Sequence, residues 1–242
     1  MALPWGMNFW TPQTGKMGDG WAYTYGAHTI CGFKQTHQPS PWINDYGQFS
    51  LMPVRGRDKL GEESRQSWFS HQSETAKPYY YSVYLADHDV VAEMAPTDRA
   101  AVLRFTFPEG EQSRIQIDLA RRVGGTAERQ YIEVVDKHTI AGWMKCTPAT
   151  GGWGNGEGQA DYTVYFYAQA DKPMENYGFW RADIPDDWVR KRDEVVSVPY
   201  LQRVAAAPVV TGIDRIEGRH IGFYTEFGTR QDEQVILRAV SY

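Results

Sequence analysis

Residues 115–119 read Ile115-Gln116-Ile117-Asp118-Leu119 and alternate apolar and polar side chains without a break. Because successive side chains of a β-strand point to opposite faces, this stretch predicts a strand with one apolar and one polar face. Similar segments, rich in β-branched and aromatic residues, are Tyr80–Leu85, Val102–Phe107, Tyr131–Val135, Thr139–Met144, Tyr162–Ala168, His220–Thr225 and Val235–Val240. Each of them is predicted to be a strand.

Turn-forming residues separate these segments. They lie at 108–111, 136–138, 151–156 and 170–173, and include Pro108, Gly110, Asp136 and Pro173. Many short strands with turns between them are typical of a sandwich or a barrel, whereas a βαβ sheet needs helices between its strands. The sequence shows no long amphipathic helical pattern and no internal repeat. We therefore predict an all-β fold.

Two stretches resist assignment to strands. Residues 12–53 are dense in Gly, Pro, Trp, His and Asn, and residues 56–77 are polar and charged. Loops of this length inside a compact domain are usually functional or disordered. The first stretch is too aromatic for disorder, so we predict a long functional loop there.

Composition excludes several classes of protein. The chain has 242 residues and a net charge of −5, and its Lys and Arg residues are scattered, which argues against a nucleic-acid partner. No apolar run approaches the roughly 20 residues that span a bilayer. Aromatic residues make up 14% of the chain, and their ring faces suit both pleated sheets and the apolar faces of sugars. Two cysteines, Cys31 and Cys146, are too few to define a redox compartment.

The two ends of the sequence suggest a piece of a longer protein. The opening residues lack the charged and apolar regions of a signal peptide, so the protein is cytoplasmic or begins after a removed leader. The last residues, Val235 to Tyr242, end within an apolar strand. Natural termini tend to be exposed and polar, so we expect a further domain.

A proline-braced segment carries the strongest chemical pattern. It reads His37-Gln-Pro-Ser-Pro-Trp42-Ile-Asn44-Asp45-Tyr-Gly47. Its prolines stiffen the backbone, which can hold Trp42 outward beside the polar groups of His37, Asn44 and Asp45. A flat apolar ring next to short donors and acceptors is what sugar recognition requires. The alternative is an ordinary turn in which Trp42 joins the core and Asp45 caps the backbone.

Other chemistries fit the sequence less well. A metal site built from His28, His37, Asp45 and His71 matches no known ligand spacing. No Gly-x-Ser-x-Gly elbow and no Cys–His pair indicates a nucleophile. The glycine-rich residues 151–158 lack the Gly-Lys-Ser/Thr ending of a phosphate loop. A flexible hairpin loop is the better interpretation of that stretch.

The segment Cys31–Pro53 resembles the signature of glycoside hydrolase family 92, the exo-acting α-mannosidases. Three further stretches agree in order and spacing. Leu3–Met7 resembles the family's Pro-Phe-Gly-Met segment, with Trp5 in place of Phe, and Phe69–Leu85 resembles its Phe-Ser-His block, with Tyr79 in place of Gly. Glu93–Pro108 resembles the block that follows.

This resemblance implies that residues 1–242 are the N-terminal, two-sheet antiparallel β-sandwich of a larger enzyme. The family's enzymes are calcium-dependent and remove terminal α-mannose from glycans with inversion. Their catalytic carboxylates come from an (α/α)₆ helical domain that follows the sandwich. The chain is therefore expected to hold no catalytic residue and no calcium ligand, to be inactive alone, and to be secreted or periplasmic. The alternative is a non-catalytic carbohydrate-binding module; a purely structural sandwich is a third possibility.

The resemblance also implies a set of substrate-binding residues in this chain. They are Trp5, Gly6, His37, Trp42, Asn44 and Asp45. We further expect Trp5, Phe9, Trp10 and Trp42 to form an aromatic patch that faces the helical domain, since inter-domain interfaces are sizeable.

Overall fold

The computed structural model describes residues 1–14, 23–36, 50–57, 60–119, 121–122, 125–126, 129–146, 162–174, 176–185 and 198–242. Within these ranges the chain forms two large antiparallel sheets and a two-stranded ribbon of β10 (Arg121–Arg122) and β11 (Gly125–Thr126). The predicted all-β, two-sheet sandwich is confirmed. No helix in the described ranges is long and apolar enough to cross a membrane.

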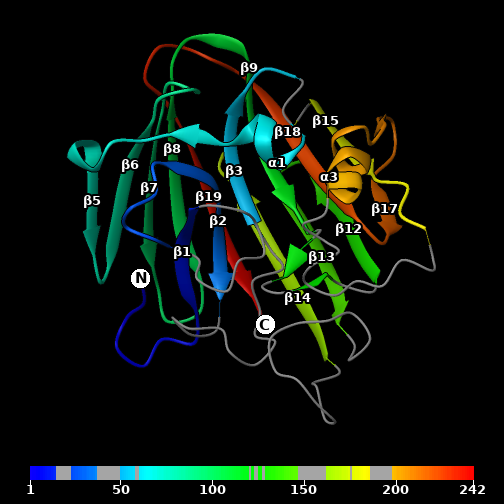
Figure 1. Cartoon of the computed structure of the whole chain (residues 1–242), viewed down its shortest axis with the longest axis horizontal. Helices are drawn as coiled ribbons and strands as arrows, with labels where there is room; N and C mark the ends of the chain where they lie inside the picture. Colours follow the sequence, from blue (N-terminus) through cyan, green and yellow to red (C-terminus); the bar gives the residue numbers. More distant parts are fainter. Residues whose placement is uncertain are drawn as a thin grey trace.

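The first sheet has eight strands. Their order is β1 (Phe9–Thr14), β2 (Thr29–Thr36), β3 (Ser50–Arg55), β9 (Gly110–Asp118), β18 (Ile221–Thr229), β15 (Asn176–Arg181) and β16 (Val209–Val210), with β4 (Ser67–Trp68) paired to β2. The second sheet has nine strands and extends across the molecule from β5 to β17 (Figure 1). Their order is β17 (Arg215–Gly218), β12 (Arg129–Asp136), β13 (Thr139–Cys146), β14 (Tyr162–Ala170), β19 (Glu233–Ser241), β8 (Ala101–Phe107), β7 (Val90–Pro96), β6 (Tyr80–Leu85) and β5 (Glu74–Lys77).

The main core lies between the two sheets. On β8, Leu103, Phe105 and Phe107 are buried while Arg104 is exposed, which is the alternation that the sequence shows. From the first sheet, side chains such as Ile117 join the same core cluster. Because the described strands pair with one another within the chain and share this core, the chain has what it needs to fold as one unit.

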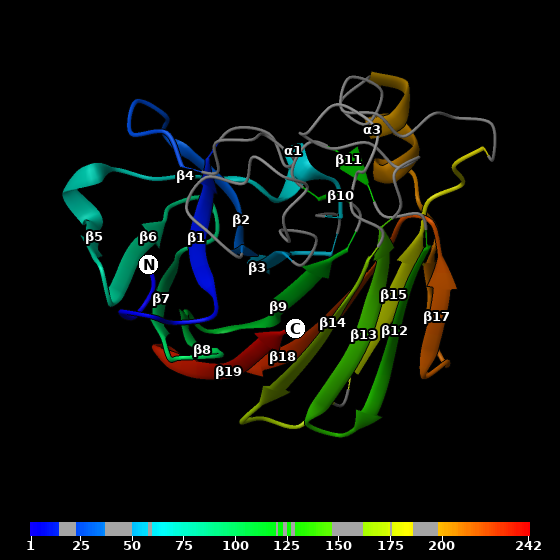
Figure 2. The ribbon, with the colours of Figure 1, turned by 90° about the horizontal axis from the view of Figure 1, so that it is seen from below.

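The first sheet is buried on its outer face as well. Two short helices, α1 (Glu62–Arg65) and α3 (Val198–Ala205), lie on the side of the molecule away from β8 and β19 (Figure 2). A second, smaller core forms on this side. Its buried members are Leu60, Trp180, Ala182, Ile184, Tyr200, Val204, Ala207 and Tyr224.

Both loop predictions are wrong where the structure describes these residues, and double burial explains the first of them. Residues 12–53 contribute to β1, β2 and β3, and residues 56–77 contain α1, β4, β5 and the 3₁₀ turn η1 (His71–Ser73). A strand covered on both faces does not alternate apolar with polar. Polar residues of β1 and β2, including Gln13, Lys34 and Gln35, are therefore buried, and the alternation is lost.

The predicted aromatic patch is partly wrong. Trp10 is fully buried, because its side chain belongs to the main core between the two sheets. Phe9, its neighbour on the opposite face of β1, is half-buried, and Trp5 is fully exposed. Trp42 lies outside the described residues, as do the glycine-rich residues 151–158.

Candidate functional site

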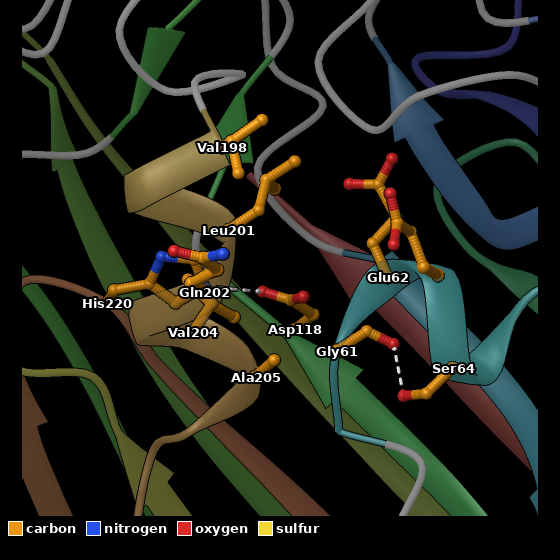
Figure 3. Close-up of a pocket in the computed structure, with 11 residues that line it drawn as sticks. Gly61, Glu62, Ser64, Asp118, Val198, Leu201, Gln202, Val204, Ala205 and His220 are labelled. Carbon is orange, nitrogen blue, oxygen red and sulfur yellow. Dashed lines mark hydrogen bonds and ion pairs between the residues drawn. The ribbon is translucent and has the colours of Figure 1, made fainter.

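A cavity of about 290 Å³ opens between α1 and α3 on the outer face of the first sheet. Asp118, the last residue of β9, lies between the two helices, with Glu62 on the α1 side (Figure 3). Leu201 and Gln202 line the α3 side, and His220 lines the cavity beside Gln202 (Figure 3). The cavity therefore combines carboxylates with a partly apolar wall, which is the make-up of a small polar-ligand site.

A buried ion pair joins α1 to the sheet beneath it. Arg65 Nη1 lies 2.5 Å from Asp118 Oδ2, and the side chains are 2% and 9% exposed. Arg65 also donates from Nε to the carbonyl of Cys31 and from Nη1 to the carbonyl of Leu60. Burial by itself lowers the pKa of Arg65, but the charges of Asp118 and Glu62 outweigh burial and raise it. The guanidinium therefore stays charged, and it favours the ionised form of Asp118.

Two further residues extend this pair to α3. His220 Nε2 lies 3.7 Å from Asp118 Oδ1, and the Tyr200 hydroxyl lies 2.5 Å from His220 Nδ1. Both residues are buried. The row Arg65–Asp118–His220–Tyr200 thus fixes both helices to the first sheet. A carboxylate held by a guanidinium is a hydrogen-bond acceptor for hydroxyls rather than a proton donor, so the row can position a ligand but is poorly suited to general acid catalysis.

No pattern along the chain predicted this row. Asp118 was predicted on the solvent face of its strand, and Arg65 lies in a stretch predicted as a loop. The contact from Arg65 to Asp118 joins residues 53 positions apart. Local periodicity carries no information about such a contact, and helices as short as α1 show no readable helical period.

The structure places only two of the six predicted substrate-binding residues. Trp5 is fully exposed in a turn closed by the hydrogen bond from Gly6 N to Leu3 O, at 2.9 Å. The next residue, Met7, donates its amide to the carbonyl of Asp98, in the connection between β7 and β8. His37, Trp42, Asn44 and Asp45 lie in residues 37–49, outside the described ranges. Their role stays a prediction.

Trp5 also has an unusual backbone. Its φ angle is +63°, in the left-handed region that non-glycine residues rarely adopt. Such strain persists only where the surroundings impose it, and it is common at functional sites. The combination of strain and full exposure is compatible with the predicted contact between Trp5 and a ligand.

The described residues do not fit a calcium site. Within the ranges that the structure describes, no three His, Cys, Asp or Glu side chains converge on a point where they could hold a metal ion. His28 and His71 approach each other, with ring centroids 5.3 Å apart. Both nitrogens of His71, however, face acceptors, Glu74 Oε2 at 2.7 Å and Tyr25 O at 2.6 Å. We therefore assign no metal-dependent step to these residues.

The fold and this cavity define a two-sheet β-sandwich with a helix-covered outer face and a candidate polar-ligand site. Comparison with known families identifies the family: the glycosyl hydrolase family 92 N-terminal domain matches residues 1–241. The chain belongs to this family. The predicted family resemblance is confirmed.

Solved structures of family GH92 enzymes resemble the chain in fold and sequence. An inverting mannosidase of family GH92 from Bacteroides thetaiotaomicron is 32% identical to the chain, with a TM-score of 0.74, over 99% of this chain and 28% of that one. An α-mannosidase of the same family and organism, solved in complex with mannoimidazole, is 26% identical, with a TM-score of 0.78, over 99% of this chain and 30% of that one. The chain thus spans less than a third of the length of these relatives. No curated protein matches the chain.

Proposed function

We propose that this chain is the N-terminal domain of a calcium-dependent, inverting exo-α-mannosidase that acts on terminal α-mannose of glycans. The observation that carries the proposal is the family match over residues 1–241, together with 32% identity to an inverting mannosidase of family GH92. Inversion requires one carboxylic acid to protonate the leaving oxygen and one carboxylate to activate water. The buried carboxylate of Asp118, which Arg65 holds, is poorly suited to the acid role, and by the family resemblance both roles belong to a helical domain.

The catalytic carboxylates and the calcium ligands are accordingly assigned to a helical domain of the same polypeptide. The sandwich then contributes substrate contacts, and the residues proposed for them on the family resemblance are Trp5, Gly6, His37, Trp42, Asn44 and Asp45. We also propose that the complete protein is secreted or periplasmic, where mannose-containing glycans are met.

The test compares the complete polypeptide with residues 1–242 alone. The complete polypeptide should release mannose from an α-linked mannobiose, lose that activity with a calcium chelator and regain it with added Ca²⁺. Proton NMR of the first product should show the β-anomer. The chain alone should release nothing. Mannose release by the chain alone, or a product that retains the α-configuration, contradicts the proposal. If the complete polypeptide binds mannosides but hydrolyses none of them, the carbohydrate-binding alternative is supported.

A further inference from the structure

Four aromatic side chains form a continuous row on the surface. The ring of Tyr25 stacks on His71 with centroids 4.2 Å apart and an interplanar angle of 10°. His71 lies 5.3 Å from His28, and His28 is stacked with Trp68 at 6.5 Å and 20°. We call Tyr25, His71, His28 and Trp68 the aromatic row. Its outer rings are open to solvent, Tyr25 being 71% and Trp68 49% exposed.

A buried carboxylate holds the centre of the row. Glu74, whose side chain is 6% exposed, accepts hydrogen bonds from His71 Nδ1 at 2.7 Å, from the Tyr81 hydroxyl at 2.6 Å and from the Tyr23 hydroxyl at 2.9 Å. The second nitrogen of His71 lies 2.6 Å from the carbonyl oxygen of Tyr25. The His71 ring is thus fixed at both nitrogens, and Tyr25 rests on it. Burial and the bonds to Glu74 raise the pKa of Tyr81 and Tyr23, so both phenols remain donors.

Such bracing reduces the entropy that a surface must lose when it binds a ligand. Tyr and Trp also present large apolar faces with few rotatable bonds. A row of exposed rings held by a network of buried hydrogen bonds is therefore preorganised for stacking. Scattered exposed aromatic residues lack this bracing.

The edge of the row is polar and acidic. The carboxylate of Asp87, an exposed residue, accepts the backbone N–H of Trp68 at 2.6 Å. The side chain of Gln72, next to His71, is exposed. Aromatic faces beside a carboxylate and an amide suit a pyranose ring, whose C–H face is apolar and whose hydroxyls donate and accept hydrogen bonds. The carboxylate of Asp87 disfavours anionic lipid surfaces and nucleic acid, which favours a neutral glycan over either of them.

The aromatic row lies apart from the Trp5–Gly6 turn. Trp68 pairs with Thr29 at the start of β2, next to the Thr14 end of β1. The Trp5–Gly6 turn leads into the opposite end of β1, at Phe9. Five residue steps along a strand correspond to about 17 Å. A ligand at the row is therefore not the mannose unit that the Trp5–Gly6 turn is expected to contact.

We propose that the aromatic row is a second glycan-binding surface, which stacks hexopyranose units of a neutral, mannose-containing chain. The choice of mannose rests on the proposed function, whereas the stacking geometry does not. The row would retain long glycans on the protein while their ends are processed elsewhere.

Binding is measured by calorimetry with linear manno-oligosaccharides and the 242-residue chain. The wild-type chain should bind saturably, and Trp68→Ala and Tyr25→Ala should each weaken binding by about tenfold or more. The matched control is Tyr165→Ala, because Tyr165 is 44% exposed and stacked on Tyr242 at 5.7 Å, away from the row. The affinity of Tyr165→Ala for the oligosaccharides should equal that of the wild type. Absence of binding by the wild-type chain, or equal affinities for all the variants, overturns the inference.

The complete polypeptide separates this inference from the proposed function. Hydrolysis of an aryl α-mannoside, which has only one sugar, should be unchanged by Trp68→Ala, whereas KM for a long mannan should rise. If the wild-type polypeptide does not cleave the aryl mannoside, the proposed function fails, and the binding experiment on the chain still decides the inference. If Trp68→Ala lowers aryl mannoside cleavage and Tm together, the row packs against the rest of the polypeptide, and the inference is overturned.

Discussion

Arg65 Nη1 lies 2.5 Å from Asp118 Oδ2, and this pair connects α1 to β9 in the interior. Removing one partner of a buried ion pair leaves an uncompensated charge, so Arg65→Ala should lower the free energy of unfolding by about 3–5 kcal/mol. Replacing both partners, in Arg65→Met with Asp118→Leu, should recover at least half of this loss because no charge is left buried. Urea unfolding of the chain measures both variants.

A surface pair provides the control for that experiment. Arg203 lies 3.3 Å from Asp183, whose side chain is 96% exposed, and Arg203→Ala should change the free energy of unfolding by less than about 1 kcal/mol. If the double variant is as unstable as Arg65→Ala, packing rather than charge balance explains the importance of Arg65.

The strand that contains Asp118 shows which features of the fold can be predicted from the sequence alone. Alternation correctly predicted the strand that includes residues 115–118, and the other predicted strands are confirmed to within one residue at the ends of the predicted segments. The alternation also implied that Gln116 and Asp118 face solvent, yet they are 1% and 7% exposed. Asp118 lies between α1 and α3, which are too short to produce a visible helical period.

The candidate site was harder to predict for the same reason. Trp5, which a contiguous motif singled out, is fully exposed, and its contact with a substrate stays a prediction. His220 lies between Asp118 and Tyr200 only after three separate segments come together. Tyr25 and Trp68 belong to one surface for the same reason. Periodicity describes neighbours along the chain, whereas these sites depend on contacts between distant segments.

Glu93 gives the chain a pH-dependent contribution to stability. Its carboxylate accepts hydrogen bonds at 2.6 Å from Nε and Nη2 of Arg104, on the facing position of β8, and from the Tyr80 hydroxyl. The bonds from Arg104 hold the pKa of Glu93 below its ordinary value of 4.5. A lowered pKa in the folded state stabilises the fold above the unfolded pKa, and this stabilisation is lost as the pH falls through the folded value.

Arg104→Gln should therefore be less stable than the wild type at pH 6.5, and the difference should shrink as the pH falls below about 4.5. Urea unfolding of both proteins at pH 6.5, 4.5 and 3.5 measures this. A difference that stays constant over the whole range indicates that Arg104 acts through packing of its side chain and not through the ionised carboxylate.

Gly222 allows the Trp180 ring to lie directly on the first sheet. A Cβ at residue 222 would lie 1.9 Å from Cζ2 of Trp180, and the tryptophan is fully buried beneath α3. Gly222→Ala should displace the ring and lower the free energy of unfolding by about 1–3 kcal/mol, with a red shift of tryptophan fluorescence. Gly26→Ala is the control, because among the residues that the structure describes no heavy atom outside its chain neighbours lies within 4 Å of its Cβ position. Equal stability of the two variants would show that the sheet accommodates the methyl group.

Trp5 combines full exposure with a φ angle of +63°. A left-handed backbone costs a non-glycine residue about 1–2 kcal/mol, and a side chain in solvent recovers none of it through packing. Trp5→Gly should therefore raise the free energy of unfolding by up to about 1 kcal/mol, the greater freedom of glycine in the unfolded chain offsetting part of the gain. Trp5→Ala keeps the strain and should leave stability within about 0.5 kcal/mol of the wild type.

Both substitutions remove the ring that is predicted to contact the sugar. In the complete polypeptide, Trp5→Gly and Trp5→Ala should therefore lower kcat/KM for an α-linked mannobiose to a similar extent, although their stabilities differ. This pairing separates the two roles, because a merely structural tryptophan would change stability and activity together. If Trp5→Ala unfolds at lower urea concentration and kcat/KM is unchanged, the ring packs against another part of the polypeptide. If both variants keep wild-type kcat/KM and Trp5→Gly is more stable, the ring has no part in substrate binding, and the strain at residue 5 follows from the turn between Leu3 and Gly6 alone.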